Sequence, residues 1–300
     1  MTNASNKKVI IVVGPTASGK TALAVRLAKY FNSEVISADS RQFYRHMVIG
    51  TAQPTYEEMA GIPHHFINYI PVEDEFTAGR FASEAQRLIY KIHQTNDVVI
   101  VAGGSGLYLN ALFFGIDDIP SDKAIRNELN HKFEQEGIEL LTQQLKSLDP
   151  ETIAEIDIKN PKRVIRALEV CLTTGKKYSE LRKNTLQIPP YKTIWIGIDL
   201  PREVLYERIN ERVDRMIENG LVEEARNLHP LKKLNALQTV GYRELFACFE
   251  GEHSLQEAID KIKQHTRNFA KRQMTWFRKN PEINWLSSAD INEVLNIIKS

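Results

Sequence analysis

The sequence predicts an α/β protein: a P-loop NTPase-like parallel sheet flanked by helices, with a helical insertion and a helical C-terminal region. Three observations support this fold class. Val9–Val13 is a short, fully apolar run of β-branched residues, as buried parallel strands are. The phosphate-loop motif G-x-x-x-x-G-K-[ST] follows at once, at Gly14–Thr21. Apolar residues then recur at helical spacing, so the loop is expected to open a helix.

Strand-like runs alternate with helical segments along the first part of the chain, a pattern typical of parallel sheets with helices on both faces. These runs are Val9–Val13, Glu34–Ser37, Val98–Ala102 and Thr193–Asp199. Polar or glycine residues follow each run, and ligands of open parallel sheets bind at the carboxyl ends of the strands. We therefore expect the four strand ends to share one cleft.

Between Asp117 and Pro190 the pattern changes to successive short helices, over a stretch longer than a crossover connection needs. The expected helices are Asp122–Glu136, Ile138–Lys146, Pro161–Thr173 and roughly Lys176–Lys183. We interpret residues 118–189 as a helical insertion in a P-loop catalytic core made of residues 1–117 and 190–300. From Pro201 onward the chain is expected to be almost wholly helical.

The composition limits the classes of partner. The chain of 300 residues carries 39 basic and 38 acidic residues, so any nucleic-acid contact must come from local basic patches. Cys171 and Cys248 lie far apart and are expected to be buried apolar residues. The N-terminus lacks a signal-type apolar core, and no apolar run reaches the length of about eighteen residues that a membrane span needs. We expect a cytoplasmic, monomeric protein without a membrane segment.

The phosphate loop predicts a polyphosphate site. Backbone N–H groups at the start of the helix converge on an anion, Lys20 adds positive charge, and the Thr21 hydroxyl can bind Mg²⁺, which is therefore the expected cofactor. The predicted diphosphate- or nucleotide-binding residues are Gly14, Pro15, Thr16, Ala17, Ser18, Gly19, Lys20 and Thr21. Whether ATP competes for this loop is left open.

The acidic strand end is not where an ordinary P-loop NTPase has it. Such an enzyme carries an Asp after a second apolar strand, but here the Val98–Ala102 run ends in Gly103–Gly106, without a carboxylate. The acid follows the second strand, at Asp39, and polar residues that can hydrogen-bond bases or phosphates come directly after it. Asp39 either faces the substrate or caps a helix. Ser105 likewise either points at the substrate or caps a turn.

Basic residues gather in two places. Residues 261–279 contain seven Lys or Arg in nineteen positions and no acid, with interleaved aromatic residues. This mixture is typical of single-stranded RNA binding, although a helix that docks its aromatic side chains on the core would show it too. A second cluster begins the main helix of the insertion. It consists of Lys159, Lys162, Arg163 and Arg166.

Four further arginines, Arg202, Arg208, Arg212 and Arg215, are interleaved with acidic residues. A solvated, salt-bridged helix face is the favoured interpretation, although some of the four could face the phosphate site. His64 and His65 are expected to be a structural pair in the loop that follows Ile62–Pro63, because adjacent side chains diverge and do not share one metal.

Eight motifs in this order resemble the tRNA dimethylallyltransferase family, also called tRNA isopentenyltransferases, over about residues 8–279. The motifs are Gly14–Thr21; Asp39–Gln42 with Tyr44; Gly50–Pro54; His64–His65; Gly103–Tyr108; Asn160–Arg163 with Arg166–Glu169; Val240–Arg243; and Lys271–Trp276. Ser105 stands where the family usually has Thr, which keeps the hydroxyl. Gln53 stands where Lys is frequent, which removes one contact to phosphate or RNA.

The resemblance implies transfer of a dimethylallyl group from dimethylallyl diphosphate to N6 of the adenosine just 3′ of the anticodon of tRNA, with release of diphosphate. It implies catalytic roles for Asp39 as general base and for Ser105, Lys20 and Thr16. The tRNA-binding residues that it implies are Asp39, Ser40, Arg41, Gln42, Ser105, Arg126, Lys162, Arg163, Arg166, Gln238, Val240, Gly241, Tyr242, Arg243, Lys271, Arg272, Gln273, Trp276 and Arg278. We hypothesise that the insertion closes over the anticodon stem.

Two other functions fit the same residues. A P-loop small-molecule kinase would consume ATP and need no tRNA. A non-catalytic, nucleotide-gated RNA-binding protein would bind RNA without turnover.

Overall fold

The computed structural model describes residues 7–117, 119–182 and 189–299. The chain divides into two compact units, the first made of Met1–Phe113 with Ile188–Ser300 and the second of Phe114–Gln187. The second unit takes in nearly the same residues as the insertion predicted at 118–189.

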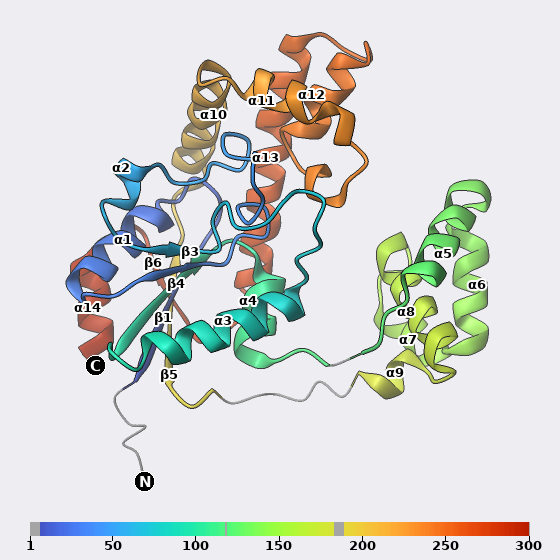
Figure 1. Cartoon of the computed structure of the whole chain (residues 1–300), viewed down its shortest axis with the longest axis horizontal. Coiled ribbons are helices and arrows are strands. Elements are labelled where there is room, and N and C mark those ends of the chain that lie inside the picture. Colours follow the sequence, from blue (N-terminus) through green and yellow to red (C-terminus); the bar gives the residue numbers. More distant parts are fainter. Residues whose placement is uncertain (1–6, 118, 183–188, 300) are drawn as a thin grey trace. The chain divides into compact units, whose positions relative to one another are not determined.

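The first unit is built on a six-stranded sheet in which every pair of neighbouring strands is parallel (Figure 1). The strand order is β3-β2-β4-β1-β5-β6. The strands are β1 (Lys8–Val13), β2 (Val35–Ser37), β3 (His64–His65), β4 (Val98–Gly103), β5 (Lys192–Ile198) and β6 (Ile283–Leu286). The predicted fold class is confirmed, and the four predicted strands are β1, β2, β4 and β5.

Two strands escaped the sequence analysis. β3 is only two residues long, and the pair His64–His65 that was expected in a loop forms this edge strand. The expectation of an almost wholly helical chain after Pro201 is wrong at β6. Polar Asn284 interrupts the apolar pattern there, and its Nδ2 donates to the carbonyl oxygen of Trp195 at 3.1 Å. Pairing with β5, a tertiary contact, makes this segment a strand.

Helices cover both faces of the sheet. α1 and α14 pack on one face, where Leu23, Leu27 and Val294 join a buried cluster with alternate residues of the strands such as Ile10 and Ile196. α4 packs on the other face, where the ring of Phe113 meets that of Trp195 edge to face at 5.3 Å between centroids. The helices of this unit are α1 (Lys20–Tyr30), α2 (Tyr56–Met59), α3 (Ala78–Ile92), α4 (Gly106–Phe114), α10 (Arg202–Glu218), α11 (Leu221–Leu228), α12 (Tyr242–Phe249), α13 (Leu255–Phe277) and α14 (Ile291–Lys299), with short 3₁₀ helices η1 (His229–Leu231) and η2 (Asn235–Leu237).

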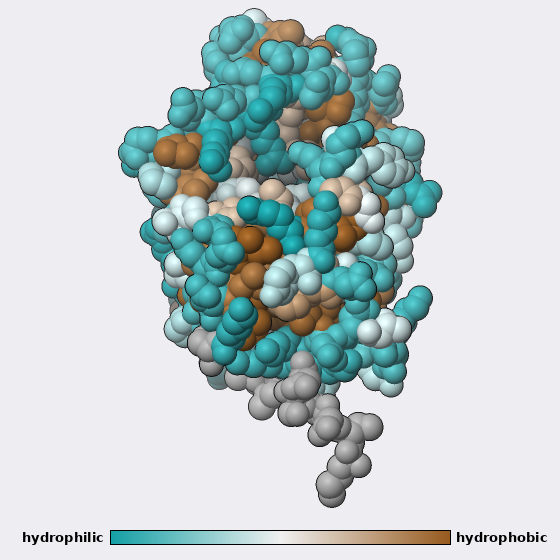
Figure 2. Space-filling model, turned by 90° about the vertical axis from the view of Figure 1, so that its left-hand side faces the viewer, coloured by the Kyte–Doolittle hydropathy of each residue, from teal (hydrophilic) through white to brown (hydrophobic). Residues whose placement is uncertain are grey.

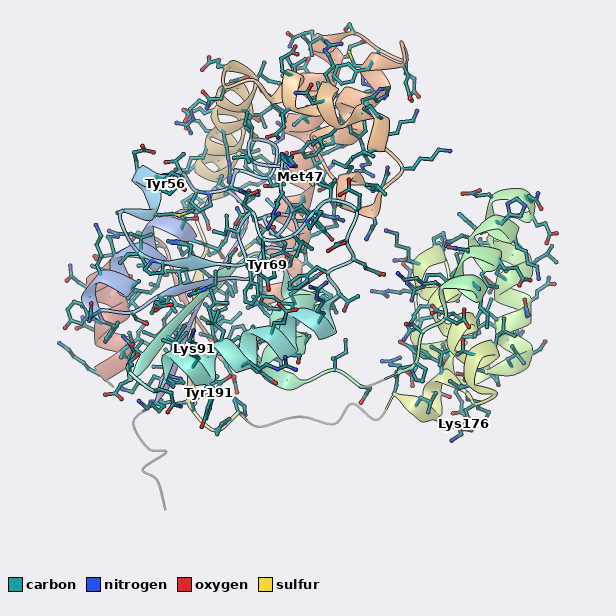
Figure 3. The ribbon with its side chains drawn as sticks, in the orientation of Figure 1. Met47, Tyr56, Tyr69, Lys91, Lys176 and Tyr191 are labelled. Carbon is teal, nitrogen blue, oxygen red and sulfur yellow. The ribbon has the colours of Figure 1, made fainter. Side chains whose placement is uncertain are left out.

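The long segment between β2 and α3, residues 38–77, is mostly irregular but firmly packed. Phe43 is completely buried, and its ring stacks on that of Phe81 at 5.5 Å. Met47 is buried as well, whereas Tyr56 on α2 is 89% exposed (Figure 3). Buried side chains such as these therefore hold in place a segment that has little regular structure of its own.

The second unit is a small helical bundle with its own core. α8 (Pro161–Thr174) lies at its centre and packs against α5 (Lys123–Glu136) and α6 (Ile138–Leu148) through Leu129, Leu145 and Leu168. α7 (Pro150–Glu155), which was not predicted, begins after the side-chain cap of Asp149. The last helix, α9, covers Tyr178–Leu181; the predicted end at Lys183 lies outside the described residues. Cys171 is buried in this core and Cys248 is half-buried in the first unit; both are free thiols.

Figure 2 shows one face of the molecule, on which hydrophilic residues cover most of the surface and apolar residues gather in patches between them. Single exposed apolar side chains, such as Leu107, are ordinary on protein surfaces. Within residues 7–117, 119–182 and 189–299, no helix has both the length and the apolar character that a membrane crossing requires.

The carboxyl end of β4 packs closely against the segment that follows β2. A β-carbon placed on Gly103 would sit 2.2 Å from the carbonyl oxygen of Ala38, and one on Gly104 would sit 2.2 Å from the side-chain nitrogen of Gln273. Only glycine permits this approach, which brings two strand ends together where the site is built.

Gly103→Ala is expected to destabilise the protein by about 3 kcal/mol, because the atoms that the new β-carbon would meet are backbone atoms of Ala38, which cannot move freely. Urea denaturation would measure the loss. Gly61→Ala is the control: the added β-carbon meets no atom within 4 Å, and only its φ of +78° opposes the substitution, so a cost of about 1 kcal/mol is expected. Equal losses in the two variants would contradict the close approach.

Candidate active site

A pocket of about 370 Å³ opens at the carboxyl ends of β1, β2 and β4, where Thr16, Ser37 and Gly103 line it. These are three of the four strand ends that were expected to share a cleft. The end of β5 does not line this pocket. Asp199, which follows β5, accepts a hydrogen bond from Arg278 Nη2 at 2.8 Å. The predicted contact of Arg278 with tRNA stays a prediction.

The phosphate loop forms one side of the pocket. Gly19 in the left-handed region begins α1 without a side-chain cap, and the N–H groups of the first helical turn have no acceptor within the helix. Lys20 and Thr21 line the pocket, and Lys20 Nζ donates to the carbonyl oxygen of Pro15 at 2.6 Å. Within the part of the chain that the structure describes, the buried Ser18 hydroxyl has no hydrogen-bond partner. This loop can therefore still satisfy an anion.

Two cations lie on the phosphate side. The pKa of Lys20 is lowered to about 7, mainly by burial, against the opposing charge of Asp39 and with a smaller contribution from the charge of Arg212. Arg212 comes from α10, lines the pocket and donates from Nη1 to the Thr16 hydroxyl at 3.0 Å. Burial lowers the pKa of Arg212 as well. Both side chains are thus partly stripped of water and are positioned for an anion.

Asp39 stands on the other side. Its Oδ1 accepts a hydrogen bond from the backbone N–H of Arg41 at 3.0 Å, in a turn rather than at the start of a helix. The Ser105 hydroxyl accepts from the backbone N–H of Ser40 at 2.9 Å and donates to the Ser40 hydroxyl at 3.1 Å. Ser105 therefore holds the residue that follows Asp39 through two hydrogen bonds.

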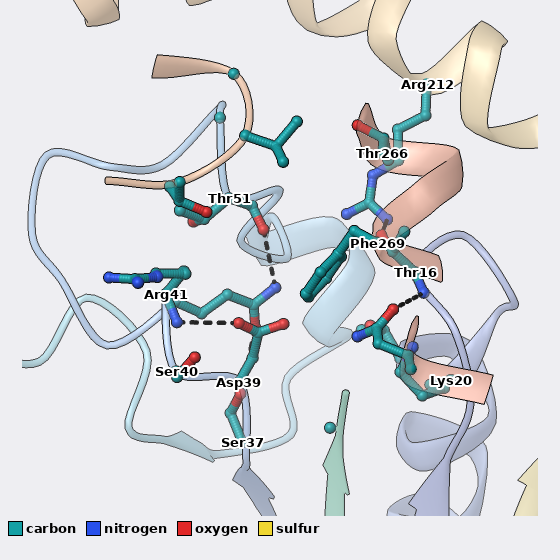
Figure 4. Close-up of a pocket in the computed structure, with 18 of the residues that line it drawn as sticks. Thr16, Lys20, Ser37, Asp39, Ser40, Arg41, Thr51, Arg212, Thr266 and Phe269 are labelled. Atoms are coloured by element: carbon teal, nitrogen blue, oxygen red, sulfur yellow. Dashed lines mark hydrogen bonds between the residues drawn. The ribbon is translucent and has the colours of Figure 1, made fainter. Parts of the chain in front are cut away.

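Figure 4 shows the two sides of the pocket: Asp39, Ser40, Arg41 and Thr51 on one, and Lys20, Thr16 and Arg212 on the other, with the ring of Phe269 between them. We call these the Asp39 side and the phosphate side. Apolar side chains from α10, α11 and α13 also line the pocket. We call these side chains the apolar wall; they are Ile209, Val213, Met216, Leu221, Ile262 and Phe269.

Most predicted site residues of the first unit gather at this pocket. Those that line it are Thr16, Lys20, Thr21, Asp39, Ser40, Arg41, Gln42, Gln238, Val240, Gly241, Arg243, Arg272 and Gln273. Several of them also form hydrogen bonds within the protein, and Arg41 and Gln273 are examples. Arg41 Nη1 donates to the carbonyl oxygen of Asn235 at 2.7 Å. Gln273 is nearly buried and binds the backbone of Thr16 and Gly104.

Some predicted tRNA contacts are placed elsewhere. Tyr242, which was predicted to bind tRNA, is completely buried, and its hydroxyl donates a hydrogen bond to Glu224. Trp276 lies against Gly106, 40% exposed, and Lys271 is exposed; their contact with tRNA stays a prediction.

In the second unit, Arg126 and Arg166 bind the fully buried carboxylate of Glu169, and Arg166 also donates to the carbonyl oxygens of Ile119 and Pro120. These two arginines help to hold their own unit together; their contact with tRNA stays a prediction. Lys162 and Arg163 are exposed on the same helix, α8, and their predicted contact with tRNA is untested.

Sequence reasoning named Arg212 only as one of four arginines that could face the phosphate site, with a solvated helix face favoured, and it missed the apolar wall. Arg212 follows the buried residues Leu205 and Ile209 of α10 at helical spacing, a signal that places it on the inward face. Arg208 shares part of that spacing. The spacing would therefore have reduced the number of candidate arginines but would not have identified Arg212 alone. The apolar wall has no local signal, because its residues have the same pattern as ordinary core positions.

A parallel sheet with a phosphate loop at its carboxyl edge defines a P-loop-type α/β protein. The sequence profile of the family described as IPP transferase matches residues 42–280. The tRNA dimethylallyltransferase of Cytophaga hutchinsonii is 50% identical over 296 residues, which are 98% of this chain and 97% of that protein. The chain belongs to the tRNA dimethylallyltransferase family.

Solved structures of relatives agree with this family assignment. The full-length tRNA isopentenylpyrophosphate transferase from Bacillus halodurans superposes with a TM-score of 0.70 at 40% identity, over 98% of this chain and 94% of that one. A eukaryotic dimethylallyltransferase acting on tRNA superposes with a TM-score of 0.79 at 30% identity, over 96% of this chain and 75% of that one. These relatives support a prenyltransferase and do not support the kinase or the non-catalytic RNA-binding protein.

Diphosphate is expected to bind with uptake of a proton at pH 8. With the pKa of Lys20 at about 7, the free side chain is mostly neutral at pH 8, and a bound anion restores its charge. Titration calorimetry in buffers of different ionisation enthalpy would measure the uptake, and Lys20→Met would isolate the share of this residue. At pH 6 the difference between wild type and variant should nearly vanish. Equal proton uptake by both proteins at pH 8 would contradict this assignment.

Proposed function

We propose that the protein transfers a dimethylallyl group from dimethylallyl diphosphate to N6 of the adenosine immediately 3′ of the anticodon in tRNA, and releases diphosphate. The observation that carries the proposal is one pocket that holds a carboxylate, Asp39, opposite the two cations Lys20 and Arg212, with an apolar wall beside them. A cytoplasmic, monomeric enzyme is part of the proposal.

The phosphate side supports departure of diphosphate. When the allylic C–O bond breaks, negative charge grows on the leaving diphosphate, and donors already aimed at that position stabilise it. Lys20, Arg212 and the N–H groups at the start of α1 supply such donors. Since the two cations are already largely desolvated, little rearrangement is needed when the charge develops.

The apolar wall suits the prenyl group. The allylic carbon becomes cation-like as its bond breaks, so the pocket beside it must exclude water and other nucleophiles. The hydrocarbon side chains of Ile209, Val213 and Ile262 offer no nucleophilic atom. The ring of Phe269 presents a π face toward which a developing cation is attracted.

Asp39 is the proposed general base. The exocyclic amine of adenine is a weak nucleophile, and it becomes acidic only as the new C–N bond forms. A carboxylate beside it can then take the proton, which remains on Asp39 until solvent removes it. Asp39 has one oxygen engaged by the N–H of Arg41, which fixes the side chain in place.

Mg²⁺ is the proposed cofactor, with Thr21 as its protein ligand. Mg²⁺ is commonly held by one or two protein oxygens together with substrate phosphates, and the Thr21 hydroxyl beside Lys20 fits that donor set. In the described ranges, no cluster of three or more His, Cys, Asp or Glu residues could hold a metal by itself, which agrees with a site that depends on the substrate. Bound there, Mg²⁺ would neutralise charge on the diphosphate.

The tRNA contacts are proposed on two basic surfaces. Along α13, Arg272 lines the pocket beside Phe269, with its guanidinium 5.8 Å from the centre of that ring. Exposed Lys162 and Arg163 on α8 form the second surface. Contacts to the RNA backbone can offset the few kcal/mol that extrusion of the target base costs.

Purified protein with labelled dimethylallyl diphosphate and unmodified tRNA should place label in the tRNA. Phosphate transfer from ATP to a small acceptor, without label in tRNA, would overturn the proposal.

Asp39→Asn is expected to lower kcat by about 10²–10⁴-fold, because the amide keeps the shape but cannot accept the proton. The Kd for tRNA should change little, since the substitution removes no basic contact. Asp74→Asn, at an exposed acid outside the pocket, is the matched control and should leave kcat unchanged. Full activity of Asp39→Asn would show that the proton goes elsewhere.

A further inference from the structure

Glu224 on α11 accepts hydrogen bonds from four donors. Its Oε2 accepts from the backbone N–H groups of Val48 and Ile49 at 2.9 and 2.8 Å. Its Oε1 accepts from the backbone N–H of Gly50 at 2.8 Å and from the hydroxyl of Tyr242 at 2.7 Å. One half-buried carboxylate thus fixes three consecutive peptide groups of an irregular segment that lies far from it in sequence.

We call residues 47–53 the Glu224-bound loop. Gly50 and Thr51 of this loop line the pocket. The loop also contacts the strand end that carries the proposed base: Gln42 Nε2 donates to the carbonyl oxygens of Thr51 and Ala52, at 3.2 and 2.9 Å. Figure 4 shows Thr51 on the Asp39 side. Glu224 therefore reaches the Asp39 side through one loop.

Tyr242, one of the four donors to Glu224, also packs against the Glu224-bound loop. It is completely buried, and a β-carbon on Gly50 would sit 2.6 Å from its ring, so the loop rests directly on the ring. Burial, together with the neighbouring Glu224, raises the pKa of the Tyr242 phenol far above its ordinary value. The hydroxyl therefore stays protonated and remains a donor to Glu224.

The phosphate side is held by different residues. Thr16 is bound by Gln273 through its backbone N–H and by Arg212 through its hydroxyl, and none of these contacts includes Glu224 or the Glu224-bound loop. A change at Glu224 should therefore act on one side of the pocket.

We propose that Glu224 is a positioning residue for the acceptor nucleotide: by holding Val48–Gly50 it fixes the Gly50–Thr51 wall against which the target base and its neighbours in the tRNA loop must fit. The inference rests on the proposed function and names a residue that determines the fit of the RNA, not of the prenyl donor.

Glu224→Gln tests the proposal. An amide leaves one oxygen for four donors and turns an N–H₂ group toward at least one of them. The KM for tRNA should rise by about tenfold or more, the effect expected for loss of a hydrogen bond to a charged group. The KM for dimethylallyl diphosphate and the Kd for diphosphate should stay within about twofold, since the two sides share no partner.

Two further variants test whether the effect is specific to the hydrogen bonds of Glu224. Tyr242→Phe removes one donor and keeps the ring beneath Gly50, so it should raise the KM for tRNA in the same direction but less. Glu223→Gln is the matched control on the same helix: its side chain is 71% exposed and 3.7 Å from Arg226, and both KM values should stay at the wild-type level.

An unchanged KM for tRNA in Glu224→Gln would overturn the proposal. So would equal rises in both KM values with a lower melting temperature, because that pattern marks a general loss of structure. If Glu224→Gln does not fold, Tyr242→Phe decides alone, and a wild-type KM for tRNA in that variant overturns it. Failure of the proposed function is distinct: wild-type protein would then put no label in tRNA.

Discussion

The amide of Gln273 is the contact on which the geometry of the site depends. Its oxygen accepts from the N–H of Thr16 at 2.9 Å and its nitrogen donates to the carbonyl oxygen of Gly104 at 3.0 Å. One side chain from α13 thus joins the loops that follow β1 and β4. Because the amide is nearly buried, losing either partner would leave a polar group unsatisfied, which costs about 1–3 kcal/mol. The phosphate loop is therefore fixed by a helix remote in sequence.

Charge in the pocket is arranged before any substrate arrives. Lys20 and Arg212 lie close enough for Arg212 to lower the pKa of Lys20, and Asp39 acts on both in the opposite direction. Such an arrangement disfavours the free protein slightly and favours an anion that relieves the repulsion. The apolar wall from α10 and α13 keeps the local dielectric low, so each of these interactions is stronger than it would be at the surface.

Local patterns determined what could be predicted. β1, the phosphate loop and Asp39 each carry a short signal: an apolar run, a fixed glycine spacing, or an acid after a strand. The apolar wall, Arg212 and the burial of Tyr242 arise from how α10 to α13 pack on the strand ends, and no window of the sequence records that packing. The same limit applies to Arg126 and Arg166, because no local pattern shows that both bind the buried carboxylate of Glu169. β6 escaped because its pairing with β5, not its own composition, makes it a strand.

The place of β6 in the chain has a consequence for biosynthesis. β5 is made well before β6, and the whole of α10–α13 lies between them. During translation the outer edge of β5 therefore stays open while those four helices emerge, with its backbone N–H and C=O groups free to pair with another chain. Contacts between segments so far apart also form slowly. The nascent protein should thus be most vulnerable to aggregation late in synthesis, when the phosphate loop has already been made but the edge strand β6 has not yet paired with β5.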